Sequence, residues 1–323
     1  MVSATQATAR DIPRPRRSAG ADHAFRLAAG GAAVLVLVVL AAIAAAMFVG
    51  GLPAFRAFGL PFLYGTVWNP VEKQFAAGVA IYGTLVTSLI AMLIAVPVSF
   101  GIAVFLTEVA PAWMRGPVAT AIELLAGVPS IIFGMWGLFA FVPFMANYVE
   151  PWLNDHLGPI PGIGVLFSGP PLGIGMLTAG IILGIMVIPF ISAVMRDVFA
   201  LVPGQLREAA FAVGATRWEV VRKVVLPYTS AAVIGGIFLG LGRALGETMA
   251  VTFVLGNAHD LSASLLMPGN SISAAIANEF TEADSPLYVS SLIALGFLLF
   301  VITFVVLCFG KLMLMRVARQ GGR

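Results

Sequence analysis

The sequence predicts an all-α, polytopic membrane protein with six transmembrane helices, and three observations lead to this fold class. Hydrophobic residues make up 60% of the 323 residues and charged residues 10%, with a mean hydropathy of +1.00. Soluble domains contain about 25% charged residues, so a soluble protein with a large core is excluded. Long segments contain no charge at all, and Lys and Arg gather in segments that would share one side of a membrane.

The charge-free segments place the helices. Asp, Glu, Lys and Arg are all absent from residues 27–55, 74–107, 124–149 and 285–310. A helix needs about 20 apolar residues to cross the hydrocarbon region. Helices are expected near residues 27–49, 78–107, 118–143, 173–197, 228–256 and 287–313. They form a transmembrane domain at 27–315, between a disordered basic tail at 1–26 and a short tail at 316–323.

The distribution of Lys and Arg predicts the orientation. Arg56 and Lys73 follow the first helix, Arg243 lies within the fifth, and the other 15 of the 18 basic residues fall in segments on the opposite side. Positive charge is enriched in cytoplasmic loops. Both termini and both tails are therefore expected in the cytoplasm, which agrees with an even number of helices.

Arg243 and Glu247 lie inside the expected fifth helix, where charge is costly. The segment from Tyr228 to Gly256 contains no other charged residue. A charge at the bilayer centre costs roughly 2.5–3.5 kcal/mol on insertion scales. Four residues apart on one helix, both side chains would point to the same side. We expect that side to face a water-filled or protein-lined pathway; the alternative is a clamp that only joins helices.

The longest polar segment between helices runs from Arg196 to Pro227. Pro203 can open a short helix that ends at Gly214, because glycine permits a left-handed turn. Thr216 and Glu219 have capping-box spacing and predict a second helix, which Pro227 is expected to end as the next membrane helix begins. A basic amphipathic loop on lipid headgroups is the alternative, but it does not explain the glycine break.

The spacing in this segment resembles the EAA motif in permease subunits of ABC importers. The matching residues are Glu208, Ala209, Ala210, Gly214, Leu226 and Pro227, with Val224 where Ile is usual. The resemblance implies that residues 203–226 are a coupling segment, which fits a cleft on an ATPase dimer and moves when that dimer closes. The chain lacks the G-x-x-x-x-G-K-S/T loop that cradles ATP phosphates. We therefore expect no enzyme activity and no catalytic residue in this chain.

Other segments resemble the permease subunits of the phosphate-specific ABC import system, of the PstC type. They are Gly65–Pro70, Glu123–Gly137, Gly240–Ala250 and Gly256–Asn257. The resemblance implies the type I ABC importer permease fold and uptake of inorganic phosphate across the cytoplasmic membrane. It implies a pathway beside Arg243, Glu247, Thr248, Gly242 and Gly246.

The same resemblance implies the partners. They are the ATP-binding subunits, a second homologous permease of the PstA type, an extracytoplasmic phosphate-binding protein, phosphate itself and membrane lipid. No nucleic acid, cofactor or metal is expected. Within the class, the alternative is import of another oxyanion, such as sulfate or molybdate. A secondary transporter or channel that uses the pair for proton coupling is a different class, and it has no use for the coupling segment. A structural or signalling membrane protein is a third class, in which Arg243 would be dispensable.

The chemistry of the pair fits an oxyanion. Arg243 lies about 22 Å along the helix from Tyr228, and a guanidinium can donate two hydrogen bonds to one oxyanion. Glu247 would repel phosphate, which leaves two hypotheses: it pairs with Arg243 between transport events, or it accepts a hydrogen bond from protonated phosphate. Glu123, at a helix end, is expected in a cap or an interhelical hydrogen bond.

Overall fold

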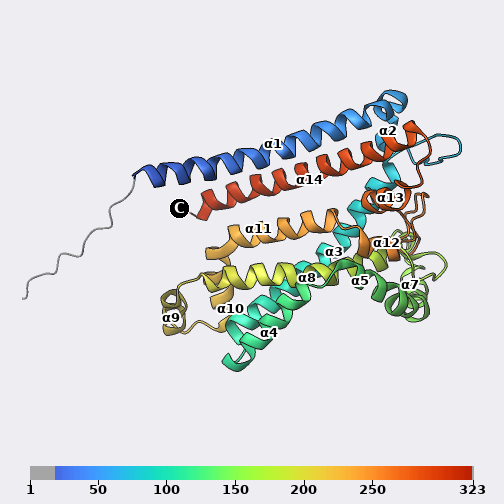
Figure 1. Ribbon diagram of the computed structural model, residues 1–323. Coiled ribbons are helices and arrows are strands. Elements are labelled where there is room, and N and C mark those ends of the chain that lie inside the picture. Colours follow the sequence, from blue (N-terminus) through green and yellow to red (C-terminus); the bar gives the residue numbers. More distant parts are fainter. Residues whose placement is uncertain (1–18, 322–323) are drawn as a thin grey trace, which may run out of the picture. The chain divides into compact units, whose positions relative to one another are not determined.

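The computed structural model describes residues 19–321 (Figure 1). The expected basic tail lies outside the described residues as far as residue 18, and its remainder, 19–26, is helical. The expected C-terminal tail is also helical as far as Gly321. The described residues contain no strand, and their isolated bridges join Asn69 to Gln74 and Gly256 to Gly269.

Helices make up most of the described chain, with short π-helical turns inside several of them. In chain order the α-helices are α1 (Ala19–Phe58), α2 (Pro61–Tyr64), α3 (Gly78–Val104), α4 (Ala112–Ala126), α5 (Ser130–Trp136), α6 (Val142–Phe144), α7 (Glu150–Leu157), α8 (Met176–Ala200), α9 (Gly204–Ala212), α10 (Arg217–Val220), α11 (Leu226–Leu245), α12 (Met249–Leu255), α13 (Ile272–Glu279) and α14 (Pro286–Gly321).

Six helices of the described chain are long and apolar enough to cross a membrane, which confirms the expected number. They are Asp22–Phe58, Gly78–Val109, Ser130–Leu157, Met176–Ala200, Arg217–Leu245 and Pro286–Arg316. The end of the fold that carries α9 and α10 is here called the coupling end. The end that carries α7 and α13 is called the opposite end (Figure 1).

The third membrane helix differs from the sequence prediction. The helix expected near 118–143 is two helices, because α4 ends at Ala126 and α5 begins at Ser130. Pro129 has no N–H to donate, and it disfavours helical geometry at the preceding residue, Val128. The membrane helix therefore starts at Ser130 and continues, through π turns, as far as Leu157.

The chain divides into two units within α1, at Met1–Ala46 and Met47–Arg323. The described part of the first unit is the beginning of α1, whose side chains from residue 22 onward are almost all exposed. The second unit contains the other five membrane helices, both ends of the fold and all the residues discussed below.

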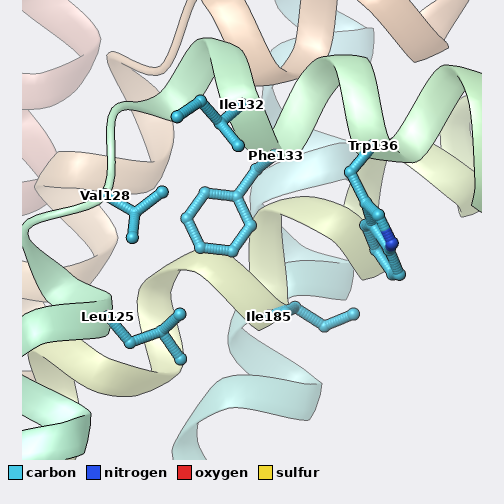
Figure 2. A pocket seen from close by; sticks show the side chains of 6 residues that line it. All are labelled: Leu125, Val128, Ile132, Phe133, Trp136 and Ile185. Atoms are coloured by element: carbon cyan, nitrogen blue, oxygen red, sulfur yellow. The ribbon is translucent and has the colours of Figure 1, made fainter.

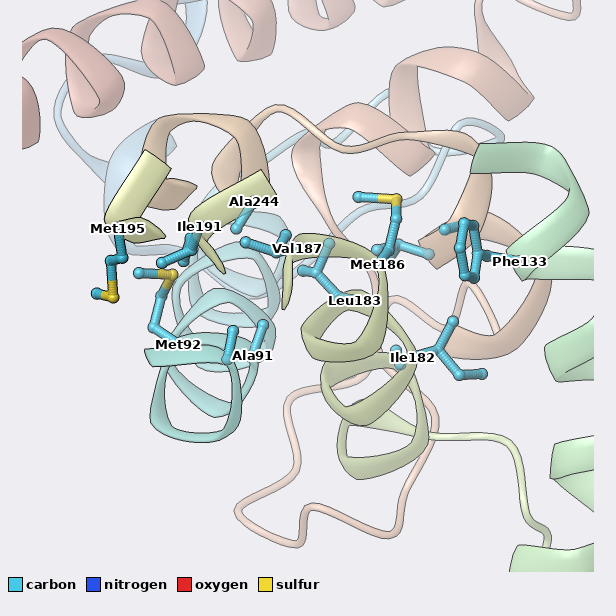
Figure 3. Close-up of a cluster of buried hydrophobic side chains, with 14 of the residues drawn as sticks. Ala91, Met92, Phe133, Ile182, Leu183, Met186, Val187, Ile191, Met195 and Ala244 are labelled. Atoms are coloured by element: carbon cyan, nitrogen blue, oxygen red, sulfur yellow. The ribbon is translucent and has the colours of Figure 1, made fainter. Parts of the chain in front are cut away.

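The core of the second unit is built around α8, which is buried along most of its length. Gly180 and Gly184 allow close approach to α3, since a Cβ at Gly180 would lie 2.6 Å from Ile90 and one at Gly184 would lie 3.2 Å from the carbonyl oxygen of Ala91. Small residues at this spacing are typical of packed membrane helices. Figure 3 shows Ala91 and Met92 of α3 beside Val187 and Ile191 of α8.

A second buried cluster lies at the opposite end and joins the end of α1, the segment around residues 62–80, α13 and α14. Its aromatic side chains include Phe62, Trp68, Phe75 and Tyr288. The ring centroids of Phe75 and Tyr288 are 4.9 Å apart and their planes are nearly parallel. This cluster fixes α13 against α3 and α14.

Candidate functional site

The fifth membrane helix is broken where its charged residues lie. The single helix expected near 228–256 is two helices, α11 and α12, separated by Gly246, Glu247 and Thr248. Arg243 and Glu247 are therefore not on one helix. Irregular backbone inside a membrane is tolerated only where it is buried in protein or lines a water-filled cavity. The break is therefore a candidate functional region.

Arg243 lies in the last turn of α11 and its side chain is exposed. Glycines at 236 and 240 let α11 pack closely against α8, since a Cβ at either would meet Val194 or Ile191 within 2.7 Å. The exposed face carries Tyr228, Leu239 and Arg243. A cation at a helix C-terminus interacts favourably with the helix dipole, which lowers the cost of the charge at this position.

Glu247 precedes α12 and is half-buried. Its Oε1 accepts a hydrogen bond from the backbone N–H of Ala250 at 3.4 Å, as suits an anion at a helix N-terminus. Among the described residues, neither Glu247 nor Arg243 takes part in an ion pair within 4.0 Å. The break thus separates the two charges and gives each a helix end that matches its sign.

The other expected pathway residues surround the break. A Cβ at Gly242 would contact Leu307 of α14 at 3.5 Å, so this glycine belongs to the packing between helices. A Cβ at Gly246 would meet nothing nearer than the carbonyl of Gly242 at 3.7 Å. The carbonyl oxygen of Thr248 accepts bonds from the backbone and hydroxyl of Thr252. Gly246 is therefore the position that leaves open space beside the charged residues.

The coupling segment has the predicted helix, glycine turn and second helix. Gly214 has φ +87° after α9, and no atom lies within 4 Å of the Cβ it lacks. Thr216 and Glu219 form the predicted capping box at the start of α10, with Thr216 Oγ1 accepting from the Glu219 N–H at 3.3 Å. Local capping signals were sufficient to predict this segment.

The motif residues of the coupling segment are divided between the surface and the core. Glu208 and Ala209 are exposed, while Ala210 is half-buried against the main core. A groove beside them is lined by Ala210, Val213, Gly214, Ala215, Glu219, Lys223 and Val224. This groove is the accessible concave surface of the coupling segment.

Pro227 does not end the second helix, contrary to the prediction. The helix continues from Arg217 to Leu245, and a π turn at Val221–Val225 precedes α11. The N–H of Leu226 donates to the carbonyl of Val221, five residues earlier. The wider turn accommodates the proline, so α10 and the fifth membrane helix form one continuous rod.

Two ion pairs tie the coupling end together. Arg196 of α8 donates to Glu123 of α4 at 2.7 Å, which confirms an interhelical role for Glu123. Arg207 of α9 lies 3.1 Å from Glu108 at the end of the second membrane helix and donates to the carbonyl of Phe199 at 2.6 Å. No local sequence pattern predicts the Arg207–Glu108 pair, because its residues are 99 positions apart.

A further cavity of the second unit does not suit an anion. Figure 2 shows this cavity between α4, α5 and α8, where it is lined by the hydrophobic side chains of Leu125, Val128, Ile132, Phe133, Trp136 and Ile185. Within the described residues, no group of three His, Cys, Asp or Glu side chains is arranged to hold a metal ion. The break in the fifth helix and the coupling segment are therefore the two candidate functional regions.

Comparison with known proteins identifies the family. The family described as "Binding-protein-dependent transport system inner membrane component" matches residues 95–319. The chain belongs to this family. Its members are permeases of ABC importers rather than catalytic subunits, so this chain is a multi-pass protein of the cytoplasmic membrane and works with a separate ATPase and a binding protein.

Several relatives of this family member are similar over nearly the whole chain. The "Phosphate transport system permease protein PstC" of Xylella fastidiosa (strain 9a5c) is 60% identical, over 96% of this chain and 95% of the relative. Proteins with the same name are 53% identical in Mesorhizobium japonicum, over 95% and 94% of the two chains, and 55% identical in Pasteurella multocida, over 90% and 91%.

Solved structures confirm that the family fold is present. A bacterial alginate ABC transporter, in complex with its alginate-bound periplasmic protein, has a TM-score of 0.59 at 18% identity, covering 92% of this chain and 97% of that chain. The inward-facing MetNI methionine ABC transporter has a TM-score of 0.55 at 17% identity, covering 74% and 94%. The expected all-α permease fold of ABC importers is thus confirmed.

The Arg207–Glu108 pair gives a stability prediction. Glu108 has a side-chain exposure of 8%, so Arg207→Ala leaves a buried carboxylate without its cation. We expect the free energy of unfolding to fall by about 1–3 kcal/mol, measured by denaturant titration in mixed micelles. In a double-mutant cycle with Glu108→Ala, the double variant should lose less than the sum of the single losses; additive losses would show that the pair is not coupled.

Proposed function

We propose that this chain is a transmembrane permease subunit of an ABC importer for inorganic phosphate, driven by ATP hydrolysis in a separate subunit. The observation that carries the proposal is the exposed guanidinium of Arg243 beside a break in a membrane helix. Such a charge is costly against lipid, so this face borders a polar pathway. The names of the relatives that are 53–60% identical support phosphate as the cargo.

The residues at the break suit a passing oxyanion. The guanidinium of Arg243 can donate two hydrogen bonds to phosphate. The open space at Gly246 lets an anion approach the backbone. Thr248 and the packing glycine Gly242 would complete this side of the pathway. Glu247 lies on the same path, where it would weaken phosphate binding or accept a bond from a protonated phosphate oxygen.

The proposed topology places the coupling end and both termini in the cytoplasm. Fifteen of the 18 Lys and Arg residues support this orientation. The coupling segment with Glu208, Ala209 and Gly214 would then fit a cleft on the ATPase dimer, and the continuous rod through Leu226 and Pro227 would carry the movement of that dimer toward Arg243. A second, homologous permease of the PstA type would complete the pathway, and an extracytoplasmic phosphate-binding protein would dock at the opposite end.

Arg243→Gln should reduce ATP-dependent uptake of labelled phosphate into vesicles by about tenfold or more, because it removes a charge-assisted hydrogen-bond donor. Tyr228→Phe, on the same exposed face of α11, is the matched control and should transport normally at equal protein level. Uptake that survives in Arg243→Gln would contradict a role in the pathway. Competition by unlabelled sulfate or molybdate as effective as by phosphate would instead indicate an importer of another oxyanion.

Glu247→Gln tests the role of the carboxylate in selectivity. If Glu247 accepts a hydrogen bond from protonated phosphate, the amide should raise the ratio of sulfate to phosphate uptake by about fivefold or more, since fully ionised sulfate lacks that proton. The measurement is uptake of both labelled anions by the same vesicles. An unchanged ratio, with uptake of both anions altered alike, would leave only the pairing role with Arg243.

Gly214 allows a test of the coupling segment. Its φ of +87° is unfavourable for residues that have a side chain. A Cβ added there would meet no other atom within 4 Å, so a substitution acts only through the backbone conformation. Gly214→Val should therefore lower co-purification with the ATPase subunit and ATP-driven uptake by at least about fivefold. Gly214→Asn, which tolerates a left-handed conformation, should retain most of both. Equal behaviour of the two variants would contradict a requirement for this turn.

A further inference from the structure

The backbone at the break receives a hydrogen bond from another helix. The hydroxyl of Ser273, in α13, donates to the carbonyl oxygen of Glu247 at 2.6 Å. Ser273 is 7% exposed, so water cannot readily replace it. A backbone carbonyl left unpaired in an apolar environment costs several kcal/mol. The Ser273 hydroxyl therefore stabilises the conformation in which Glu247 stands between α11 and α12.

The start of α13 is held rigidly at this position. Ser271 caps the helix by accepting from the N–H of Ala274 at 3.2 Å, and its hydroxyl lies 3.4 Å from that of Ser273. The N–H of Ile272 donates to Thr84 of α3 at 2.9 Å. Ile272 itself is fully buried. These contacts leave Ser273 little freedom to move unless α13 moves as a whole.

The other end of α13 carries a half-buried carboxylate that accepts hydrogen bonds from three donors. Glu279 accepts from Trp68 Nε1 at 2.7 Å, from the hydroxyl of Tyr288 at 2.5 Å and from His259 Nε2 at 2.8 Å. The Trp68 and His259 rings stack with centroids 5.6 Å apart. These donors come from three separate segments: the one after α2, the one after α12, and α14.

Glu279 is ionised under ordinary conditions. Burial raises its pKa, but the hydrogen bonds from His259, Tyr288 and Trp68 outweigh burial and hold the pKa below the usual range. Charge-assisted hydrogen bonds are about twice as strong as neutral ones. The cluster of Glu279 with Trp68, His259 and Tyr288, here called the Glu279 cluster, therefore fixes the end of α13 to two loops of the opposite end and to α14.

We infer that α13 is a strut that relays movement of the opposite end to the break in the fifth membrane helix, with Ser273 as a positioning residue for Glu247 and the Glu279 cluster as the outer anchor. Glu279 follows Ser273 by six positions, which is about 9 Å of helix, so one rigid element joins the two contacts. The inference rests on the proposed function, in which a phosphate-loaded binding protein docks at the opposite end. Docking displaces the Glu279 cluster, α13 follows, and the break changes shape.

The experiment uses the assembled importer in proteoliposomes, with ATP hydrolysis measured in the presence and absence of the phosphate-loaded binding protein. Ser273→Ala should retain basal ATP hydrolysis. The stimulation of hydrolysis by the binding protein should fall at least about fivefold, in line with the loss of one buried hydrogen bond. Ser273→Thr, which keeps the hydroxyl, should restore it. Ser291→Ala is the control, because that buried hydroxyl donates within its own helix, to Leu287.

Glu279→Gln tests the other end of the strut and serves if Ser273→Ala assembles poorly. It removes the charge of the Glu279 cluster with little change in shape, and the same loss of stimulation is expected. Normal stimulation in either assembled variant, or an equal loss in Ser291→Ala, would overturn the inference. The proposed function fails separately, if the wild-type importer does not take up labelled phosphate.

Discussion

The structure depends on one constraint: within a membrane, every backbone polar group needs a partner from the protein. Continuous helices meet this constraint by themselves, and the fifth membrane helix departs from it between Leu245 and Met249. Side chains replace backbone hydrogen bonds that are lost there. The Ser273 hydroxyl donates to the carbonyl of Glu247, and the Glu247 carboxylate accepts from the N–H of Ala250. The break is therefore a stabilised conformation rather than a local failure of the helix.

The helix α8 links the break to the coupling end. Its glycines bring α3 into close contact, and its side chains Ile191 and Val194 fill the space left by the glycines of α11. At the coupling end, α8 holds α4 through Arg196 and holds α9 through the Phe199 carbonyl, which accepts from Arg207. Movement of α9 can thus reach the membrane helices both through this anchor and along the continuous rod of α10 and α11.

The sequence predicted those features whose signals are local. Hydropathy gave six membrane helices, and Gly214 with the Thr216–Glu219 capping box gave the shape of the coupling segment. Hydropathy did not reveal the break at Gly246, because a charge-poor window averages across it and glycine is common inside membrane helices. At Pro227 the sequence predicted a helix end that the structure does not have, because a π turn accommodates the proline within a continuous helix. The Arg207–Glu108 pair and the Glu279 cluster join distant segments, which no single-sequence pattern connects.

The position of the two charges also bears on what they do. If Arg243 and Glu247 served only as a clamp, their best arrangement would be a direct ion pair, because each would neutralise the other in a low dielectric. In the part of the chain that the structure describes, the guanidinium is exposed and the carboxylate is engaged with the start of α12. The fold places each charge at a helix end of suitable sign, so neither requires the other for its stability. A guanidinium held in this way keeps its donors available, which is the property that an oxyanion passing between two permease subunits would need.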